Sequence, residues 1–360
     1  MQLQILQKLP TSGARAVEPF WHGGILYLAV AQLAQDISGE EAGMNAGNSD
    51  IDAPVYRWTG EQFVEDRRIP LPGGEDVEFF TIGERAFLAT ASLRRGTGPY
   101  ELNVHSVVYE IRGGSFVVFQ RFPTFAAKQW RHFEAGGRHF LALAQGVVAD
   151  GLIATHPSKS CLFEWDGERF VHFQDIPSAW GYNWAPMQMG NELYLGYADH
   201  LAPSLLLQWT GDRFESCQQF EGSGGRTMCP FDAFGERWLA FARLNGDSTI
   251  YRWSGNRFLA HEVLSGPGGR EFEWIADGDG GYLVQINFIH GTREAPKTAL
   301  LSGIYAFRSS GSELIQKFPT FGGTDAACFR VGDERYLAVA NSLSAEVRFR
   351  IDSQVYRLAL

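Results

Sequence analysis

One alternation of hydrophobic and polar positions recurs along this chain. An aliphatic and an aromatic residue are followed by a polar residue, a second large apolar residue, a glycine turn and a phenylalanine. The segments read VYRWTGEQF from Val55, VYEIRGGSF from Val108, LFEWDGERF from Leu162, LLQWTGDRF from Leu206 and IYRWSGNRF from Ile250. A weaker copy starts at Ile304, and the chain ends on VYRLAL from Val355. A period of two, closed by glycine, predicts β-strands joined by tight hairpins.

A second pattern lies between these copies and predicts two further strands in each repeat. It runs from an aromatic segment through a glycine turn into an aromatic-Leu-Ala run, as in EPFWHGGILYLAVA from Glu18 and RHFEAGGRHFLALA from Arg131. Repeats of this length with four short strands are typical of β-propeller blades. Seven blades fit, with approximate bounds 12–70, 71–123, 124–177, 178–220, 221–264, 265–319, and 320–360 together with 1–11.

The seventh repeat is split between the two ends of the chain. Counted on from Val355, its pattern continues at Leu3, Gln7 and Pro10. The same glutamine position holds Gln120, Gln174, Gln218 and Gln316, with Arg67 and Glu262 in two repeats. A linear solenoid would need polar caps at both ends, whereas a closed ring needs one split repeat. We therefore predict one all-β domain, a single seven-bladed β-propeller of four-stranded blades whose last blade is closed by the N-terminal strand.

Composition and charge narrow the range of partners. The 360 residues carry a formal net charge of −10, which repels phosphate backbones, so we expect no nucleic-acid partner. No apolar run is long enough to span a membrane. The first residues, MQLQILQKLP, lack the pattern of a secretory signal, so we expect a cytoplasmic protein, with an extracellular location left open.

The cysteines do not have the spacing of a zinc site. They could serve as a disulfide or a nucleophile, but small buried thiols are the simpler expectation. These residues are Cys161, Cys217, Cys229 and Cys328.

The repeated motifs VYxWxGxxF, FxxxQxLPT and FxxGxxxYLAVA together resemble the epitempin, or epilepsy-associated, repeat of the EPTP/EAR family. The resemblance covers the whole chain in seven copies. That family builds seven-bladed propellers and includes the leucine-rich glioma-inactivated proteins. The resemblance implies a recognition scaffold, because known members are mostly extracellular or cell-surface modules that bind protein partners.

The loops between the second and third strands of each blade share one face of a propeller. They vary in length here and cover approximately residues 32–54, 92–106, 145–160, 199–204, 243–248, 288–302 and 341–353. Loops held by a rigid scaffold often carry binding residues. Because the loops of blades one, two, three and six are long and those of blades four and five are short, we predict a cleft over blades four and five.

The blade crossovers lead into the innermost strands, and the repeats differ most at that point. The first ring of positions around the funnel holds Arg15, Glu75, Lys128, Tyr182, Arg226, Arg270 and Thr324. The second ring holds Ala16, Asp76, Gln129, Asn183, Thr227, Glu271 and Asp325. Four cations in the first ring suit a carboxylate or another anionic group, although a solvated mouth of mutually neutralised charges is the simpler alternative.

Aromatic residues gather near these positions in blades three, four and six, which suits a small-molecule pocket. The candidate ligand-binding residues are Arg15, Glu75, Trp130, Trp180, Asn183, Trp184, Arg226, Arg270, Glu271 and Trp274. The candidate catalytic residues are His132, Asp76, Lys128, Arg131, Tyr182 and Glu273. We would test His132 first as an acid or base, although a histidine on a strand is more often a hydrogen-bonded structural group.

The resemblance also implies a metal site, because the family repeat usually carries an aspartate that faces the channel. By that resemblance, Asp76, Glu271 and Asp325 would hold a Ca²⁺ ion in the central channel. Gln129 and Asn183 would add neutral oxygen atoms. No other cofactor is indicated.

Two classes of function stay open at this point. The first is a recognition module that binds a protein, peptide or glycan through the variable-loop face, or a small anionic or aromatic ligand. The alternative is a small-molecule enzyme of the lyase, isomerase or cyclase type with its active site in the central funnel. We favour the first, because no nucleophile-elbow, zinc-protease, P-loop or dinucleotide motif is present in a suitable context.

Overall fold

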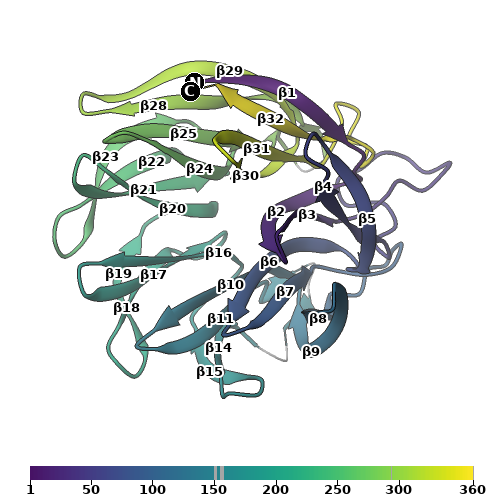
Figure 1. Cartoon of the computed structure of the whole chain (residues 1–360), viewed down its shortest axis with the longest axis horizontal. Helices are drawn as coiled ribbons and strands as arrows, with labels where there is room; N and C mark the ends of the chain where they lie inside the picture. Colours follow the sequence, from purple (N-terminus) through teal and green to yellow (C-terminus); the bar gives the residue numbers. More distant parts are fainter. Residues whose placement is uncertain (150–151, 155–157, 293, 360) are drawn as a thin grey trace.

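The computed structural model describes residues 1–149, 152–154, 158–292 and 294–359. Within those ranges the regular structure is all β, in seven four-stranded sheets that stand around a central opening (Figure 1). The prediction of a seven-bladed propeller is confirmed. In the described part of the chain, no helix is long and apolar enough to cross a membrane.

Each blade uses consecutive strands, counted from the centre outward. Blade 1 is β2 (Ala14–His22), β3 (Ile25–Gln32), β4 (Asp52–Trp58) and β5 (Phe63–Pro70). Blade 2 is β6 (Gly74–Ile82), β7 (Arg85–Ser92), β8 (Asn103–Arg112) and β9 (Ser115–Phe125). Blade 3 is β10 (Ala127–Ala135), β11 (Arg138–Gln145), β14 (Ser160–Trp165) and β15 (Phe170–Ile176). Blade 4 is β16 (Gly181–Met189), β17 (Glu192–Asp199), β18 (Ser204–Trp209) and β19 (Phe214–Phe220).

The remaining blades follow the same antiparallel order. Blade 5 is β20 (Gly225–Ala233), β21 (Glu236–Arg243), β22 (Ser248–Trp253) and β23 (Phe258–Ser265). Blade 6 is β24 (Gly269–Asp277), β25 (Gly280–Asn287), β28 (Ala299–Arg308) and β29 (Gly311–Phe321). Blade 7 is β30 (Gly323–Val331), β31 (Glu334–Asn341), β32 (Ser353–Ala359) and β1 (Gln2–Leu9). The loops add two small hairpins, β12 (Val148–Ala149) with β13 (Leu152–Ile153) and β26 (His290–Gly291) with β27 (Pro296–Lys297).

The N-terminal strand closes the ring, as the split repeat predicts. Strand β1 runs antiparallel to β32, from the pair Gln2–Ala359 to the pair Leu9–Ser353. The two chain ends therefore lie side by side on the outer edge of blade 7 (Figure 1). Leu9 is fully buried, so the closing strand contributes to the core as well as to the sheet.

The hydrophobic core lies between neighbouring blades. In one of these layers, Phe80 and Phe87 from blade 2 pack with Trp130 and Leu141 from blade 3. Similar layers join the other blades, because each strand turns alternate apolar residues toward the adjacent sheet. The apolar residues of the repeats thus build the scaffold.

The recurrent glutamine joins four of the blades to the next blade in the ring. Gln120 on β9 donates to the carbonyl of Phe170 at 2.8 Å and accepts the Phe170 N–H at 3.0 Å. Gln7 makes the same pair of hydrogen bonds to Phe63, at 2.7 and 2.8 Å, across the closure of the ring. Gln174 and Gln218 repeat this arrangement, and Arg67 and Glu262 also bind the following blade. Repetition of this residue therefore reflects blade architecture.

The crossovers place glycines where the chain passes closest to the loops. Gly73 has φ of +55°, and a Cβ at this position would lie 2.0 Å from the carbonyl oxygen of Arg94. Its N–H donates to the Ser49 carbonyl, and its own carbonyl accepts the Leu93 N–H. Glycine is therefore required where the crossover delivers the chain to the innermost strand.

The four cysteines are free, but the prediction that all four are buried is wrong. Cys161 is buried between blades, whereas Cys217 is exposed on the outer strand β19. Cys229 and Cys328 are half-buried. The exposed cysteine lies on the outermost strand of blade 4, whereas Cys229 and Cys328 lie on the innermost strands β20 and β30, a distinction that spacing does not reveal.

Candidate ligand-binding funnel

Every innermost strand carries a β-bulge where it meets the central opening. In β10 the pairing with β11 passes from Ala127 to Gln129, which leaves Lys128 as the extra residue. The same shift occurs at the first-ring position of all seven blades. A bulge turns two consecutive side chains to the same side of a strand. Both predicted rings therefore face the channel, one above the other.

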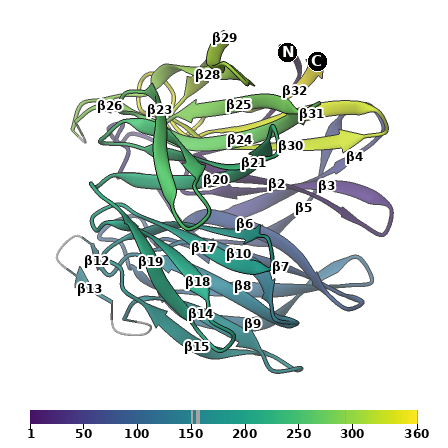
Figure 2. The same cartoon turned by 90° about the vertical axis from the view of Figure 1, so that its left-hand side faces the viewer.

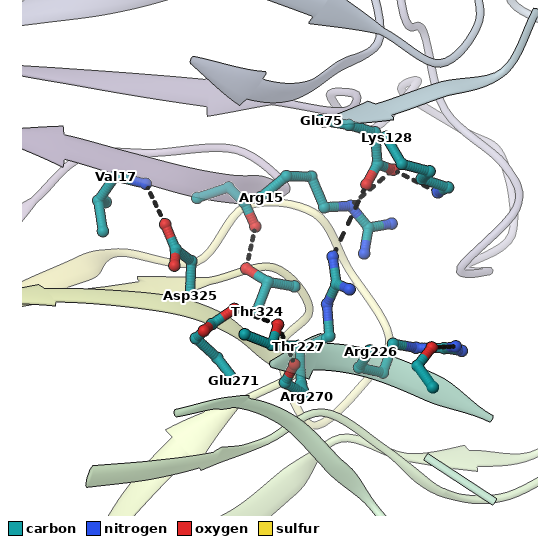
Figure 3. Close-up of polar contacts among 12 residues, drawn as sticks. Arg15, Val17, Glu75, Lys128, Arg226, Thr227, Arg270, Glu271, Thr324 and Asp325 are labelled. Atoms are coloured by element: carbon teal, nitrogen blue, oxygen red, sulfur yellow. Dashed lines mark hydrogen bonds and ion pairs between the residues drawn. The ribbon is translucent and has the colours of Figure 1, made fainter. Parts of the chain in front are cut away.

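The first ring forms a narrow waist in which three cations surround one carboxylate. Arg15 Nε lies 3.5 Å and Lys128 Nζ lies 3.2 Å from Glu75 Oε1. Arg270 Nη2 lies 4.0 Å from Glu75 Oε2, so three blades converge on this residue (Figure 3). Burial opposes ionisation of Glu75, but these three cations hold its pKa below the usual range.

Tyr182 lies in the same waist and is flanked by positive charge. The Arg226 guanidinium is 4.0 Å from the centre of the Tyr182 ring, and Lys128 and Arg270 lie 5.0 and 5.1 Å away. Burial raises the pKa of the phenol, but the nearby cations outweigh it and lower that pKa to about 8. The waist is thus an electropositive site inside an acidic protein.

Above the waist a cavity of about 1050 Å³ opens toward the variable-loop face. Five first-ring residues form its floor, and its walls come from the loops of blades 1 to 6. The apolar part of the wall is Leu33, Met44, Leu93, Leu102, Leu152, Leu244, Phe288 and Ile289. We call this cavity the funnel. Such a volume and lining are typical of ligand sites.

Hydrogen bonds between neighbouring loops hold the funnel wall in place. Arg94 donates to Ser49 Oγ at 2.9 Å and to the Ala46 carbonyl at 2.7 Å, which joins the loops of blades 1 and 2. Thr298 donates to the Ser344 carbonyl at 2.6 Å, which joins blades 6 and 7. The small hairpins β12–β13 and β26–β27 lie on this same side of the ring, at the left of Figure 2. Residues 150–151 and 155–157 of the predicted loop 145–160 lie outside the described residues.

Below the waist lies a smaller channel of about 200 Å³, lined mainly by acidic side chains. These are Glu18, Asp76, Glu78, Glu271, Glu273 and Asp325, with Arg131 among them. Burial raises the pKa of Asp76 and of Glu273 to about 8, although Arg131 acts in the opposite direction on both. Burial also raises the pKa of Glu271 well above its usual range.

The channel residues connect the inner strands of adjacent blades. Asp76 accepts the Trp130 N–H at 2.8 Å, and Asp325 accepts the Val17 N–H at 2.8 Å (Figure 3). The amide oxygens of Gln129 and Asn183 accept the N–H groups of Trp184 and Met228, at 2.6 and 2.9 Å. Glu271 accepts a hydrogen bond from the Thr227 hydroxyl at 2.6 Å. The second ring therefore joins blades around the channel.

This arrangement does not fit one calcium ion held by Asp76, Glu271 and Asp325. Among the described residues, the one group of three metal-ligating side chains with ligand atoms within 4.8 Å is Cys161, His172 and Asp175, on the outer part of blade 3. The channel carboxylates do not form such a group, and the amide oxygens that would complete the site already bind the backbone.

The predicted site residues line two cavities that share the waist. Arg15, Glu75, Lys128 and Tyr182 line both the funnel and the lower channel, and Arg226 and Trp180 line the funnel. Arg270, Asp76, Arg131, Asn183, Glu271, Glu273 and Asp325 line the lower channel. His132, Trp130, Trp184 and Trp274 belong to neither lining.

The bulge explains why these aromatic residues turn away from the channel. After two consecutive channel residues, the next side chain points between the blades, and Trp130 and Trp184 are almost completely buried there. Trp274 packs on Phe231 with ring centres 4.4 Å apart. His132 stacks on Phe80 at 4.4 Å, and burial together with His139 lowers its pKa to about 4.

Several residues of the funnel wall were missed by sequence reasoning. His200, Phe288 and Tyr100 come from loops whose conformation no repeat pattern specifies. Tyr100 contacts the Arg94 guanidinium at 3.6 Å and donates to the Gly47 carbonyl at 2.7 Å. The sequence signal available was their location in the variable loops, which does not single out individual side chains.

Known proteins resemble this chain in sequence and in fold. The EPTP domain family matches residues 5–58, 115–166, 169–210, 213–254 and 313–358. A human thrombospondin-type laminin G domain and EAR repeat-containing protein is 31% identical over 156 residues, which is 42% of this chain and 22% of that protein. Its mouse counterpart is 30% identical over 159 residues, which is 43% of this chain and 22% of that protein.

A solved structure supports the fold alone. The β-propeller domain of Cps50 (Swd1) from Myceliophteria thermophila superimposes with a TM-score of 0.57 at 10% identity, and the match covers 99% of this chain and 100% of that one.

The part of this chain that aligns with the mammalian relatives corresponds to about a fifth of the length of those proteins. Since the family segments cover more than half of the sequence, the chain belongs to the EPTP domain family.

Proposed function

We propose that this propeller is a recognition module that binds a segment of a protein partner in the funnel on the variable-loop face. The observation that carries the proposal is the funnel itself, a cavity of about 1050 Å³ with apolar walls and a charged floor. An apolar cavity with a few convergent polar groups is the usual form of a ligand site. Membership of a family of propeller repeats supports a role in protein interaction.

The rim supports this assignment because it is organised before a partner arrives. Loops joined by hydrogen bonds, such as those of Arg94 and Thr298, lose little conformational freedom on binding. The enzyme alternative gains no support from the geometry. His132, the residue named for acid or base chemistry, lies outside both cavities.

Selection of peptides tests the proposal. A displayed peptide library is panned against the protein, and selected peptides are then measured against Leu244→Arg, which places a charge on the funnel wall. The matched control is Ile25→Arg, at the hairpin end of β3 on the opposite face, where the parent side chain is 38% exposed. We expect Leu244→Arg to abolish binding and Ile25→Arg to retain it. Peptides that bind both variants equally well would refute a funnel site.

A further inference from the structure

The waist carries more positive charge than its carboxylate neutralises. Arg15, Lys128, Arg226 and Arg270 share the single acidic residue Glu75 within the first ring, which leaves three positive charges in excess. Among the described residues, Arg226 has no carboxylate within 4.0 Å of its guanidinium, which donates to the Gly225 carbonyl at 3.0 Å. Arg226 is only 3% exposed. Buried charge without a partner is costly, so this excess calls for an anion.

The carboxyl groups of the channel below have hydrogen-bond partners of their own, although Glu271 and Asp325 also attract Arg270 electrostatically. Both carboxylate oxygens of Asp325 accept backbone N–H groups, from Val17 and Ala326. Glu271 is held by the Thr227 hydroxyl and the Phe272 N–H. These carboxyl groups therefore serve the contacts between inner strands, and burial favours their neutral forms.

Unpaired polar groups on the funnel side point to the same kind of ligand. Arg15 Nε, Trp180 Nε1 and His200 Nδ1 are buried without a hydrogen-bond partner, as are both carboxylate oxygens of Glu75, which lies 3.5 Å from Arg15 Nε, and all four residues line the funnel. Arg15 is 8% exposed. Two of these atoms, Arg15 Nε and Trp180 Nε1, are N–H donors, which a ligand oxygen at the waist would satisfy. The apolar wall above them suits a hydrocarbon or aromatic stem.

We propose that the waist is an oxyanion site, and that the ligand entering the funnel presents a carboxylate, sulfate or phosphate group on an apolar stem. This proposal rests on the funnel being the recognition site. The planar guanidinium groups of Arg226 and Arg270 match the geometry of an oxyanion, and Lys128 adds a point charge. An anionic tip of a partner segment and a free organic anion offer the same chemistry.

Titration calorimetry with naphthalene-2-sulfonate tests the proposal, and its neutral analogue naphthalene-2-sulfonamide is the matched control ligand. The two probes share a stem and differ in charge. We expect the sulfonate to bind at least about ten-fold more tightly, because a charged hydrogen bond contributes more than a neutral one. Inorganic sulfate should compete with the sulfonate, since it occupies the waist without filling the apolar wall.

Arg226→Met is the informative variant. It keeps an apolar stem against Tyr182 and removes one uncompensated charge, so we expect the ligand-free protein to stay folded with a melting temperature at or above that of the parent. Sulfonate binding should weaken roughly ten- to hundred-fold, and Arg226→Lys should recover part of it. Arg308→Met is the control, because Arg308 also lies over a tyrosine ring, that of Tyr282 at 5.3 Å, but is exposed outside the funnel.

Tyr182 offers a readout in the unaltered protein. The charged groups that interact with it are Arg15, Lys128, Arg226, Arg270 and Glu75, and the ring of His200 lies 5.8 Å away. An anion at the waist neutralises the cations that favour the phenolate. Sulfate should therefore raise the pKa of Tyr182 from about 8 toward its ordinary value, as followed by ultraviolet absorbance of the phenolate, with Tyr182→Phe as the blank.

The proposal is overturned if the sulfonate and the sulfonamide bind equally, or if Arg226→Met binds the sulfonate as the parent does. If the sulfonate and the sulfonamide bind equally but Leu244→Arg still abolishes binding of the selected peptides, the funnel is the recognition site and the waist is not an oxyanion site. If the sulfonate binds much more tightly than the sulfonamide but Leu244→Arg leaves peptide binding unchanged, the waist is an oxyanion site and the funnel does not bind a partner segment. An apolar peptide carrying a C-terminal carboxylate, compared with its amide, distinguishes a partner segment from a free anion.

Discussion

Removal of one glutamine at the seam of the ring tests how the propeller is held closed. Gln7 on β1 makes two hydrogen bonds to the backbone of Phe63 in blade 1, at 2.7 and 2.8 Å, and Phe63 is 2% exposed. Gln7→Met keeps the length of the side chain and removes both bonds. Each bond contributes about 1 kcal/mol, and each buried backbone group left unpaired adds a desolvation cost of about 1–3 kcal/mol. Partial access of water to the seam reduces that cost, so we expect a loss of ~2–4 kcal/mol.

The chain contains its own control for this substitution. Gln316 occupies the equivalent position in blade 6, but its Oε1 is buried without a hydrogen-bond partner. Gln316→Met should therefore cost less than ~1 kcal/mol and could stabilise the protein, because no bond to a backbone N–H is lost.

Thermal unfolding measured by circular dichroism provides the assay. An unfolding entropy of ~2.1 cal/mol/K per residue gives ~0.8 kcal/mol/K for a chain of this length, so Gln7→Met should lower the melting temperature by ~3–5 °C. Equal shifts of the melting temperature in Gln7→Met and Gln316→Met would show that the hydrogen bonds from Gln7 to Phe63 do not stabilise the closure of the ring.

Two further predictions concern closure and pH. Deletion of residues 1–10 removes β1 and leaves β32 as an unpaired edge, so it should cost more than ~5 kcal/mol, and an unchanged melting temperature would contradict ring closure. Asp76 and Glu273 have a pKa of about 8 in the folded protein, raised above their unfolded values, so the folded state binds more protons. Stability should accordingly fall as the pH rises from about 4 to 8, by up to ~1.4 kcal/mol per pH unit for each carboxyl group. Asp76→Asn keeps an oxygen that accepts the Trp130 N–H but removes the titrating carboxyl group. The free energy of unfolding, measured with urea between about pH 5 and 8, should therefore depend less steeply on pH in this variant. An unchanged dependence would show that Asp76 does not contribute to it.

The fold could be predicted from sequence because its information is local and repeated. Each copy of the pattern around Tyr56 or Tyr251 carries the period and turn of a hairpin, and the split repeat locates the seam. The first-ring positions could also be found, because they follow a recurrent proline at a constant offset in most repeats. Their side chains do meet at the waist, where Glu75 contacts cations from three other blades.

The remaining features depend on backbone geometry that the pattern does not encode. The bulge at Lys128 shifts the alternation of β10 by one residue, and this sends Trp130 into the blade interface instead of the pocket. A residue such as Tyr100 joins the funnel because its loop folds against the loop of blade 1. Both outcomes follow from tertiary contacts, since periodicity specifies only which residues share a face.

The most direct test of the account is a crystal structure of the protein soaked in selenate, an analogue of sulfate that can be located by its anomalous scattering. We expect a selenate at the waist between the funnel and the lower channel, in contact with Arg226 and Arg270 and close to Lys128. An empty waist in crystals that hold selenate at other positions would contradict it.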